Sequence, residues 1–318
     1  MKKFLDKILI NLSVIILCIL FLVLLISFSS FYTNKLEGII FKYKGVNELG
    51  STYERSIDLY KWVEDNSKDK GLILGSSVAY RNINPYILQD KTKIDWFNCA
   101  SSAQSPSVSS ALLKNPIKYK TEFLILDLYS NIITNNGFEG IEDWVNNSQF
   151  ELGLKYKLIS QTQKSIKLYI KAFYIWIRSK INPKLRFIKS TRNGTYLGKG
   201  FVCSPNGIYP IESIDNSFKK VNYFNIDKLV NLVHKCKEKR IKLILVKPPV
   251  VNRVTRDNLE VFCKRNNIYC IDFEKNNFIR RYKDQLNKMY HDDHHMTCYG
   301  SEIYSKELSN ELSILLNN

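Results

Sequence analysis

The sequence predicts an α/β fold in which helices cover both faces of a mostly parallel sheet. Short apolar runs that end in glycine, proline or polar residues alternate with longer amphipathic segments. Hydrophobic residues make up 45% of the 318-residue chain, which is enough for a sizeable core. One long, uncharged apolar stretch near the N-terminus stands apart from this alternation.

That stretch, residues 8–28, is expected to cross a membrane, because about 20 apolar residues span a bilayer as a helix. Three lysines within the first seven residues place the N-terminus in the cytoplasm by the positive-inside rule. A cleaved signal peptide is the alternative, although the run is long for one. We therefore expect a single-pass protein of the cell membrane, with residues 1–35 as cytoplasmic tip and membrane helix and residues 36–318 as an extracytoplasmic domain.

The alternating elements begin after a connecting stalk at residues 36–52. A strand is expected wherever a short apolar run meets a turn, and a helix wherever apolar residues recur at helical spacing. The expected strands are 71–75, 94–100, 122–129, 241–249 and 268–273, and the expected helices are 53–66, 105–114, 228–240, 257–267 and 301–316.

Residues 135–220 interrupt the alternation and are predicted to form a basic, mainly helical insertion. Between residues 152 and 211 there are twelve lysines and arginines and no acidic residue. Aromatic and cationic residues interleave over 164–181, which suits a helix near anionic lipid or over a substrate groove. A core-packing helix with a solvated basic face fits the same pattern equally well.

The formal net charge of +17 makes anionic partners plausible, such as lipid head groups or an acidic surface polymer. Nucleic acid is a poor fit to an exported domain. Six of the seven cysteines follow the apolar stretch, and an exported domain could pair some of them. Their spacing does not fix which ones pair.

Gly75, Ser76 and Ser77 follow the first predicted strand. Ligands of open α/β sheets bind outside the carboxyl ends of the strands, so a serine hydroxyl at this turn would be exposed to a substrate. Backbone N–H groups at the start of the next helix can face a developing oxyanion. A bare Gly-Ser-Ser match is more often an ordinary turn or helix cap, so the motif needs support from elsewhere.

Three of the four histidines in the chain lie in the run 290–300, together with two aspartates. A serine nucleophile needs a base to take its proton, and the base needs a carboxylate to fix its tautomer. Asp292 and His295 are three positions apart, so a single turn can bring carboxylate and imidazole together. The run therefore offers the base and the carboxylate that Ser77 lacks.

The same run leaves alternatives open. His291 and His294 are rival bases, and Asp293 is a rival carboxylate. Asp292 or Asp293 could instead cap the last helix. The cluster could also bind a metal ion, but adjacent side chains are not expected to point at one ion. We therefore predict no metal and no cofactor.

The two motifs, in this order along the chain, resemble those of the SGNH (GDSL-like) hydrolase superfamily. The segment Leu74-Gly75-Ser76-Ser77 is similar to its first block, with serine in place of the usual aspartate. The residues from Asp292 to His295, followed by Gly300, are similar to its last block. The resemblance implies a three-layer flavodoxin-like sandwich in which Ser77 is the nucleophile, His295 the base and Asp292 the residue that holds the imidazole.

The two middle sequence blocks of the family match this chain less well. The glycines that usually mark these blocks are missing from residues 97–105 and 126–131. The oxyanion donors that the resemblance implies are the backbone N–H groups of Ser77 and Ala100 and the side chain of Asn131. The resemblance covers most of residues 70–134 and 225–316 and excludes the basic middle segment.

This chain combines Gly-Ser-Ser, one predicted N-terminal membrane helix and a C-terminal run rich in histidine. In this combination it resembles membrane-anchored members of the family that modify a surface polymer beside a membrane-bound O-acyltransferase. The implied function is a serine esterase or O-acyltransferase acting on acyl esters of a cell-surface polysaccharide or similar polymer. The alternative is a non-catalytic, membrane-anchored partner of an acyltransferase, or a polymer-binding protein. The degraded middle blocks favour that alternative, whereas the intact Ser77, Asp292 and His295 speak against it.

Overall fold

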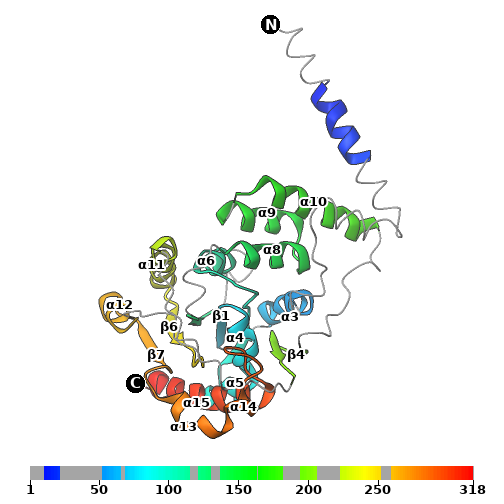
Figure 1. Ribbon diagram of the computed structural model, residues 1–318. Helices are drawn as coiled ribbons and strands as arrows, with labels where there is room; N and C mark the ends of the chain where they lie inside the picture. The colour runs from blue at the N-terminus through cyan, green and yellow to red at the C-terminus, as the bar shows by residue number, and fades with distance from the viewer. Residues whose placement is uncertain are drawn as a thin grey trace.

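A five-stranded sheet forms the centre of the computed structural model (Figure 1). Its strand order is β2-β1-β3-β6-β7, and every neighbouring pair is parallel. The strands are β1 (Lys70–Leu74), β2 (Asp95–Asn98), β3 (Phe123–Asp127), β6 (Lys242–Lys247) and β7 (Tyr269–Asp272). The structure describes residues 11–21, 52–65, 69–114, 121–129, 137–162, 164–181, 194–205, 223–251 and 259–317.

The predicted α/β class with a mostly parallel sheet is confirmed, and each of the five predicted strands is present. The order corresponds to the flavodoxin-like arrangement, in which the chain changes direction across the sheet between β1 and β3. In open α/β sheets, ligands bind outside the carboxyl ends of the strands at such a switch point. The serine motif follows β1 and therefore lies at this position of the sheet.

The sheet separates two hydrophobic cores, because successive side chains of a strand point to opposite faces. Leu72 and Leu74 of β1 belong to the first core, and Ile73 between them belongs to the second. Helices pack against each face and complete a three-layer sandwich, with α8, α9 and α10 opposite α5, α14 and α15 (Figure 1).

The first face is covered by the larger group of helices. They are α3 (Thr52–Glu64), α6 (Pro106–Lys114), α8 (Phe138–Asn147), α9 (Leu152–Gln161), α10 (Ile166–Ile181), α11 (Tyr223–Glu238) and α12 (Leu259–Asn266).

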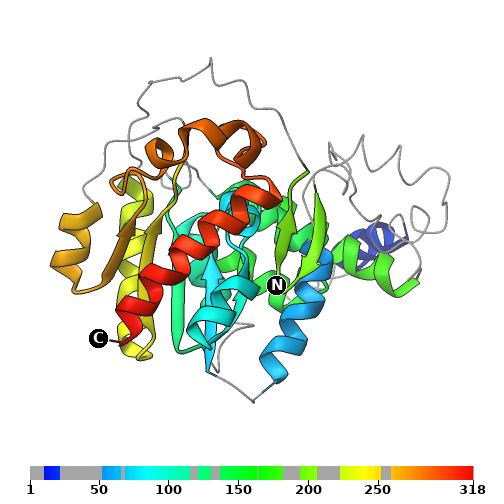
Figure 2. The ribbon, with the colours of Figure 1, turned by 90° about the horizontal axis from the view of Figure 1, so that it is seen from below.

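The second face carries the helices around the candidate site, and Figure 2 shows α15 lying across it. These helices are α4 (Ser77–Asn82), α5 (Pro85–Thr92), α13 (Phe278–Arg281), the 3₁₀ helix η3 (Lys283–Gln285), α14 (Leu286–Met289) and α15 (Cys298–Asn317).

In its described residues, the segment predicted to be a helical insertion contains the helices α8, α9 and α10, followed by an antiparallel hairpin that the sequence did not predict. The hairpin consists of β4 (Thr195–Gly198) and β5 (Phe201–Cys203). Its turn lies against the outer edge of the sheet, where the Lys199 carbonyl accepts a hydrogen bond from the N–H of Asn98 at 2.8 Å. The hairpin therefore shields part of the edge strand β2.

Helix α10 supports the core-packing interpretation of the basic segment. Leu168 and Ala172 are fully buried in the first core, and the Lys171 ammonium pairs with Glu142 of α8 at 2.7 Å. Ile166 and Ile170 remain exposed on the other side of the helix.

Two disulfides answer the pairing question that the sequence left open. Cys203 at the end of β5 is bonded to Cys298 at the start of α15, and Cys263 of α12 is bonded to Cys270 of β7. The first one joins the hairpin to the helix that follows the histidine-rich run. Both pairs lie in the domain that the sequence predicts to be extracytoplasmic.

The N-terminal stretch is only partly described. Residues 11–21 form a helix, while residues 8–10 and 22–28 of the predicted membrane span, and the stalk as far as residue 51, lie outside the described residues. Within the described part of the chain, no helix combines the length and apolar character needed to cross a bilayer.

Candidate active site

The turn after β1 presents Ser77 at the first position of α4. Gly75 has a φ of +155°, and a Cβ atom there would lie 2.8 Å from the Cβ atoms of Ala79 and Asp127, so the turn requires glycine. Ser76 caps the helix, since its hydroxyl accepts the N–H of Val78 at 3.2 Å. Because Ser76 performs the capping, the hydroxyl of Ser77 is available for another partner.

That partner is His295. Its Nε2 lies 2.8 Å from Ser77 Oγ, and its Nδ1 lies 2.7 Å from Asp292 Oδ2. The other carboxylate oxygen of Asp292 accepts the backbone N–H groups of His295 at 2.7 Å and His294 at 3.0 Å. The structure thus brings together the three residues that the sequence singled out, in the order hydroxyl, imidazole, carboxylate. Their catalytic roles remain predictions.

The electrostatics of the pair favour a neutral imidazole beside an ionised carboxylate. Burial lowers the pKa of His295 to about 4, against the opposing effect of the Asp292 hydrogen bond. Burial alone would raise the pKa of Asp292, but hydrogen bonds and charge from His295 hold it well below its usual range. With Nδ1–H donated to Asp292, the lone pair of Nε2 faces Ser77 and can accept its proton.

The two rival histidines take other positions. The ring of His294 stacks on Tyr129, with centroids 5.0 Å apart, and its Nδ1 is hydrogen-bonded to Asp293. His291 is exposed, and its backbone N–H donates to the carbonyl of His295 at 2.8 Å. Among the described histidines, His295 is the one that hydrogen-bonds Ser77.

Asn82, which the sequence did not single out, joins the loop that carries His295 to helix α4. It ends α4, and its side chain donates to the His294 carbonyl at 2.9 Å and accepts the N–H of Met296 at 2.8 Å. Both backbone groups flank His295, so the fully buried amide of Asn82 fixes the imidazole relative to Ser77. Gly300 closes the same loop, because a Cβ there would lie 2.1 Å from the Met289 carbonyl oxygen.

An Asn82→Ala chain is expected to lose about 2–3 kcal/mol of unfolding free energy, because it leaves the partly buried carbonyl of His294 and the buried N–H of Met296 without their partner. Its kcat/KM on an ester should also fall, since the histidine loop loses its connection to α4. Urea unfolding and steady-state kinetics measure the two effects. Asn310→Ala, an exposed change on α15, is the control and should leave both unchanged. Equal stability of Asn82→Ala and Asn310→Ala would contradict the assigned role of Asn82.

Arg81 lies one helical turn after Ser77 and is a second residue that sequence reasoning missed. It is 7% exposed, and its Nη1 donates to the Ser204 hydroxyl at 2.6 Å. Its positive charge also helps to lower the pKa of His295. The i, i+4 spacing from Ser77 was the available signal.

The three predicted oxyanion donors, Ser77, Ala100 and Asn131, differ in whether they are available in the structure. The Ala100 N–H donates to Asn98 Oδ1 at 3.3 Å, so it has an internal partner rather than facing an open site. The Asn98 amide is itself held by the carbonyls of Ala79 and Ile83 at 2.8 and 3.1 Å. Asn131 lies outside the described residues. The first N–H groups of an α-helix have no intrahelical partner, so the start of α4 offers the Ser77 N–H as a donor.

Asp127, at the end of β3, is a buried carboxyl beside the serine turn. Burial raises its pKa to about 8, and the one hydrogen bond that opposes this comes from the Tyr129 N–H at 3.3 Å. The group is therefore largely protonated at neutral pH, so it adds little negative charge beside Ser77.

Asp127→Asn is expected to raise the unfolding free energy by on the order of 1–3 kcal/mol at pH 8 and by much less at pH 4. The raised pKa means that the folded state binds the proton more tightly than the unfolded state. The stability of the native chain therefore falls as the pH rises from about 4 to about 8. Thermal unfolding of both chains across this range measures the difference. An equal effect at both pH values would contradict the raised pKa.

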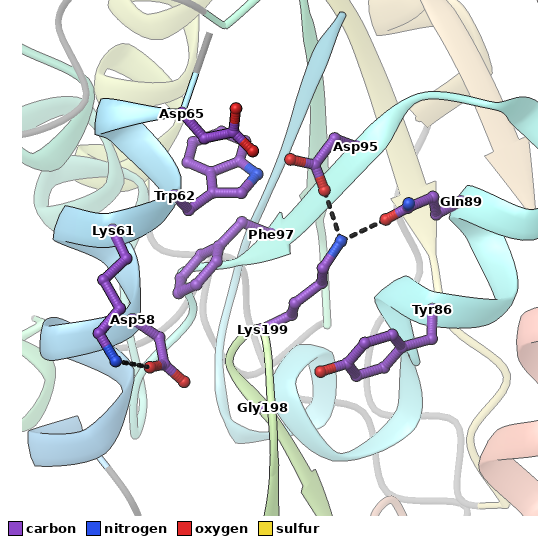
Figure 3. A pocket seen from close by; sticks show the side chains of 10 residues that line it. All are labelled: Asp58, Lys61, Trp62, Asp65, Tyr86, Gln89, Asp95, Phe97, Gly198 and Lys199. Carbon is purple, nitrogen blue, oxygen red and sulfur yellow. Dashed lines mark hydrogen bonds and ion pairs between the residues drawn. The ribbon is translucent and has the colours of Figure 1, made fainter. Parts of the chain in front are cut away.

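A cavity of about 390 Å³ lies elsewhere, beside the edge strand β2 (Figure 3). Asp95 begins β2, so the cavity is at the amino end of the strands, whereas Ser77 follows the carboxyl end of β1. Figure 3 shows Lys199 reaching between Asp95 and Gln89 and bonding both. The cavity is separate from the serine site. It is lined by Asp58, Lys61, Trp62, Asp65, Tyr86, Gln89, Asp95, Phe97, Gly198 and Lys199.

No protein-family model matches the sequence, and no curated protein matches it. The fold is similar to a solved structure from Desulfitobacterium hafniense assigned to the G-D-S-L family of lipolytic proteins. The two are 13% identical, the match covers 76% of this chain and 98% of that one, and the TM-score is 0.39.

A second solved structure, from Bacteroides fragilis and assigned as an acylhydrolase, is 11% identical, with 78% of this chain and 90% of that one covered and a TM-score of 0.34. Neither likeness is high enough to assign a family or an activity. The hydrogen-bonded geometry of Ser77, His295 and Asp292 is therefore the feature that points to a function.

Proposed function

We propose that the protein is a serine hydrolase of the SGNH type that cleaves or transfers acyl esters. The observation that carries this proposal is the continuous hydrogen-bonded relay from Ser77 through His295 to Asp292. Nucleophile, base and orienting carboxylate at these distances define the arrangement that serine acyl transfer requires.

In the proposed reaction Ser77 Oγ attacks the ester carbonyl carbon while its proton passes to His295 Nε2. The tetrahedral oxyanion collapses, the bond to the alcohol breaks, and His295 returns the proton to the leaving oxygen. An acyl group then remains on Ser77. Water or a second alcohol attacks this acyl-enzyme with the same base, giving hydrolysis or transfer respectively.

The start of α4 supports the charge that develops on the carbonyl oxygen. The Ser77 N–H has no partner within the helix, and the helix dipole is positive at this end. Removing one oxyanion donor typically costs about 10²–10³-fold in rate. The Ala100 N–H is already bonded to Asn98. The proposed oxyanion hole therefore depends on the Ser77 N–H at the start of α4, unless substrate binding frees a second donor.

The proposed substrate is an acyl ester of a cell-surface polysaccharide or similar polymer. The apolar N-terminal stretch supports this, since a membrane helix there would hold the domain at the outer surface. The net charge of +17 favours an anionic polymer or lipid surface. A membrane-bound O-acyltransferase is the proposed partner, as donor of the acyl group.

The pH profile gives a quantitative check on the proposed base. Because the pKa of His295 is lowered to about 4, kcat/KM for an ester should rise as the pH passes through about 4 and be level near neutrality. The neutral imidazole is the active form, so activity is lost on the acid side. Hydrolysis of p-nitrophenyl acetate between pH 3 and pH 8, corrected for spontaneous hydrolysis, measures the midpoint. An acid limb centred near pH 7 would contradict this assignment.

The direct test uses a fluorophosphonate probe and p-nitrophenyl acetate on the full chain. Labelling and ester cleavage are expected in the wild type and should be absent in Ser77→Ala and His295→Ala. Ser160→Ala, an exposed serine on α9, is the matched control and should behave as the wild type. An unlabelled wild type, or equal reaction of Ser77→Ala, would exclude the catalytic function and favour a non-catalytic partner of an acyltransferase. The occupied Ala100 N–H is the structural feature consistent with that second candidate.

A further inference from the structure

We propose that the loop carrying His295 is also a binding site for a divalent transition-metal ion of the zinc class, and that the bound ion switches off Ser77. The loop holds two histidine–carboxylate pairs side by side. The proposed mechanism uses the pair Asp292–His295 and leaves Asp293–His294 without a role. The metal site itself rests on geometry alone, whereas the switch rests on the proposed function.

The ligand atoms are already close together. One side-chain atom each from Asp292, His294 and His295 can be chosen so that all three lie within 4.8 Å of one another. His295 Nδ1 lies 2.7 Å from one oxygen of Asp292, and His294 Nδ1 lies 3.5 Å from the other. Ligands of tetrahedral zinc, at 2.0–2.2 Å from the ion, are about 3.4 Å apart. The spacing therefore needs little change to enclose an ion.

The donor atoms of these three residues suit zinc. Two imidazole nitrogens and one carboxylate oxygen are typical protein ligands of a zinc ion that keeps water in its fourth position. The carboxylate of Asp293 is hydrogen-bonded to His294 Nδ1 and lies outside this group of three. The sequence predicts that the adjacent side chains do not all point at one ion. Asp292, His294 and His295 nevertheless lie close enough together to face one, because the loop turns between Asp292 and His295.

The loop is held in place on several sides, so the ligands are preorganised. Asn82 binds the backbone on both sides of His295, and the Val251 N–H donates to the Asp293 carbonyl at 3.0 Å. Tyr129 stacks on the ring of His294. Neighbours that fix ligand orientation are typical of metal sites.

Inhibition follows from the tautomer of His295. In the proposed active form Nδ1 carries the proton, donated to Asp292, and Nε2 accepts from Ser77. A metal ion on Nδ1 needs its lone pair, so the proton moves to Nε2. Nε2–H then donates to Ser77 Oγ and has no lone pair left to accept its proton. No proton leaves the pair, yet the base is lost.

Binding is tested by calorimetric titration of Zn²⁺ into metal-free full chain in a Cys18→Ser background, because Cys18 is an exposed thiol that could bind zinc on its own. One equivalent should bind to the wild-type site and equally to Ser77→Ala. His294→Gln and His295→Gln should each lower the affinity by about tenfold or more. His234→Gln, an exposed histidine of α11, is the matched control and should bind as the wild type. Unchanged affinity in His294→Gln and His295→Gln would overturn the site.

The switch is tested by fluorophosphonate labelling with and without Zn²⁺, expressed as a ratio within each variant. Zn²⁺ should suppress labelling in the wild type and in His234→Gln, and suppress it much less in His294→Gln. Zinc that binds without protecting Ser77 would overturn the switch. If the wild type is never labelled, the proposed function fails, while calorimetry still decides whether the metal site exists.

Discussion

Asp292→Asn is expected to lower kcat/KM for ester hydrolysis by about 10⁴-fold with little change in KM. An amide in place of the carboxylate can donate its NH₂ to His295 Nδ1, which reverses the tautomer and leaves Nε2 protonated against Ser77. The imidazolium formed during proton transfer also loses its counter-charge. Steady-state hydrolysis of p-nitrophenyl acetate measures the effect.

Asp284→Asn, the same change at an exposed aspartate of η3, is the matched control and should retain wild-type rates. Circular dichroism of both variants checks that the fold is kept. A loss of less than about tenfold in Asp292→Asn would show that the carboxylate does not orient the base, and the relay would then be a structural contact rather than a catalytic one.

Removing the Cys203–Cys298 disulfide should produce the largest change in stability. The bond joins residues 95 positions apart, and chain entropy then predicts a loss of about 4.7 kcal/mol of unfolding free energy. The bond also connects the hairpin β4–β5 to α15, the helix that follows His295. Its removal takes away this connection beside Ser204, the residue after the hairpin, whose hydroxyl is bonded to Arg81. The double variant Cys203→Ala with Cys298→Ala, unfolded in urea, measures the loss.

The second disulfide provides an internal comparison, because Cys263 and Cys270 are 7 positions apart and the same relation predicts only about 2.4 kcal/mol for them. Its removal should leave ester hydrolysis nearly unchanged, since the described hydrogen bonds of the Ser77, His295 and Asp292 side chains involve no residue of α12 or β7. A larger loss of stability from the second pair than from the first would contradict the chain-entropy account.

Features set by local sequence could be predicted, whereas features set by distant contacts could not. The strands were found because each is a short apolar run next to a turn, and β1 followed by Gly75 is the clearest case. Asp292 and His295 were found because their spacing lets a single turn bring them together. The hairpin β4–β5 was missed because its strands are only four and three residues long and lie in a segment that otherwise has helical spacing.

The residues that support the candidate site could not be predicted from the sequence for a related reason. Asn82 acts on residues more than 200 positions away, and a single asparagine at a helix end carries no sign of that partner. Ala100 was chosen for its place after β2, but the side chain of Asn98 turns back and occupies its N–H. Side-chain orientation of this kind depends on the packed structure, because the same sequence permits several rotamers.

The order of the site residues along the chain has a consequence for biosynthesis. Ser77 and His295 are 218 positions apart, and the part of the chain between them includes most of the sheet. While the chain is being synthesised, the serine emerges long before its base. A nascent or prematurely terminated chain that ends before the histidine loop would carry an ordinary, unreactive serine. The proposed ability to attack esters would therefore be one of the last properties the growing polypeptide acquires, after the sheet strands have been made.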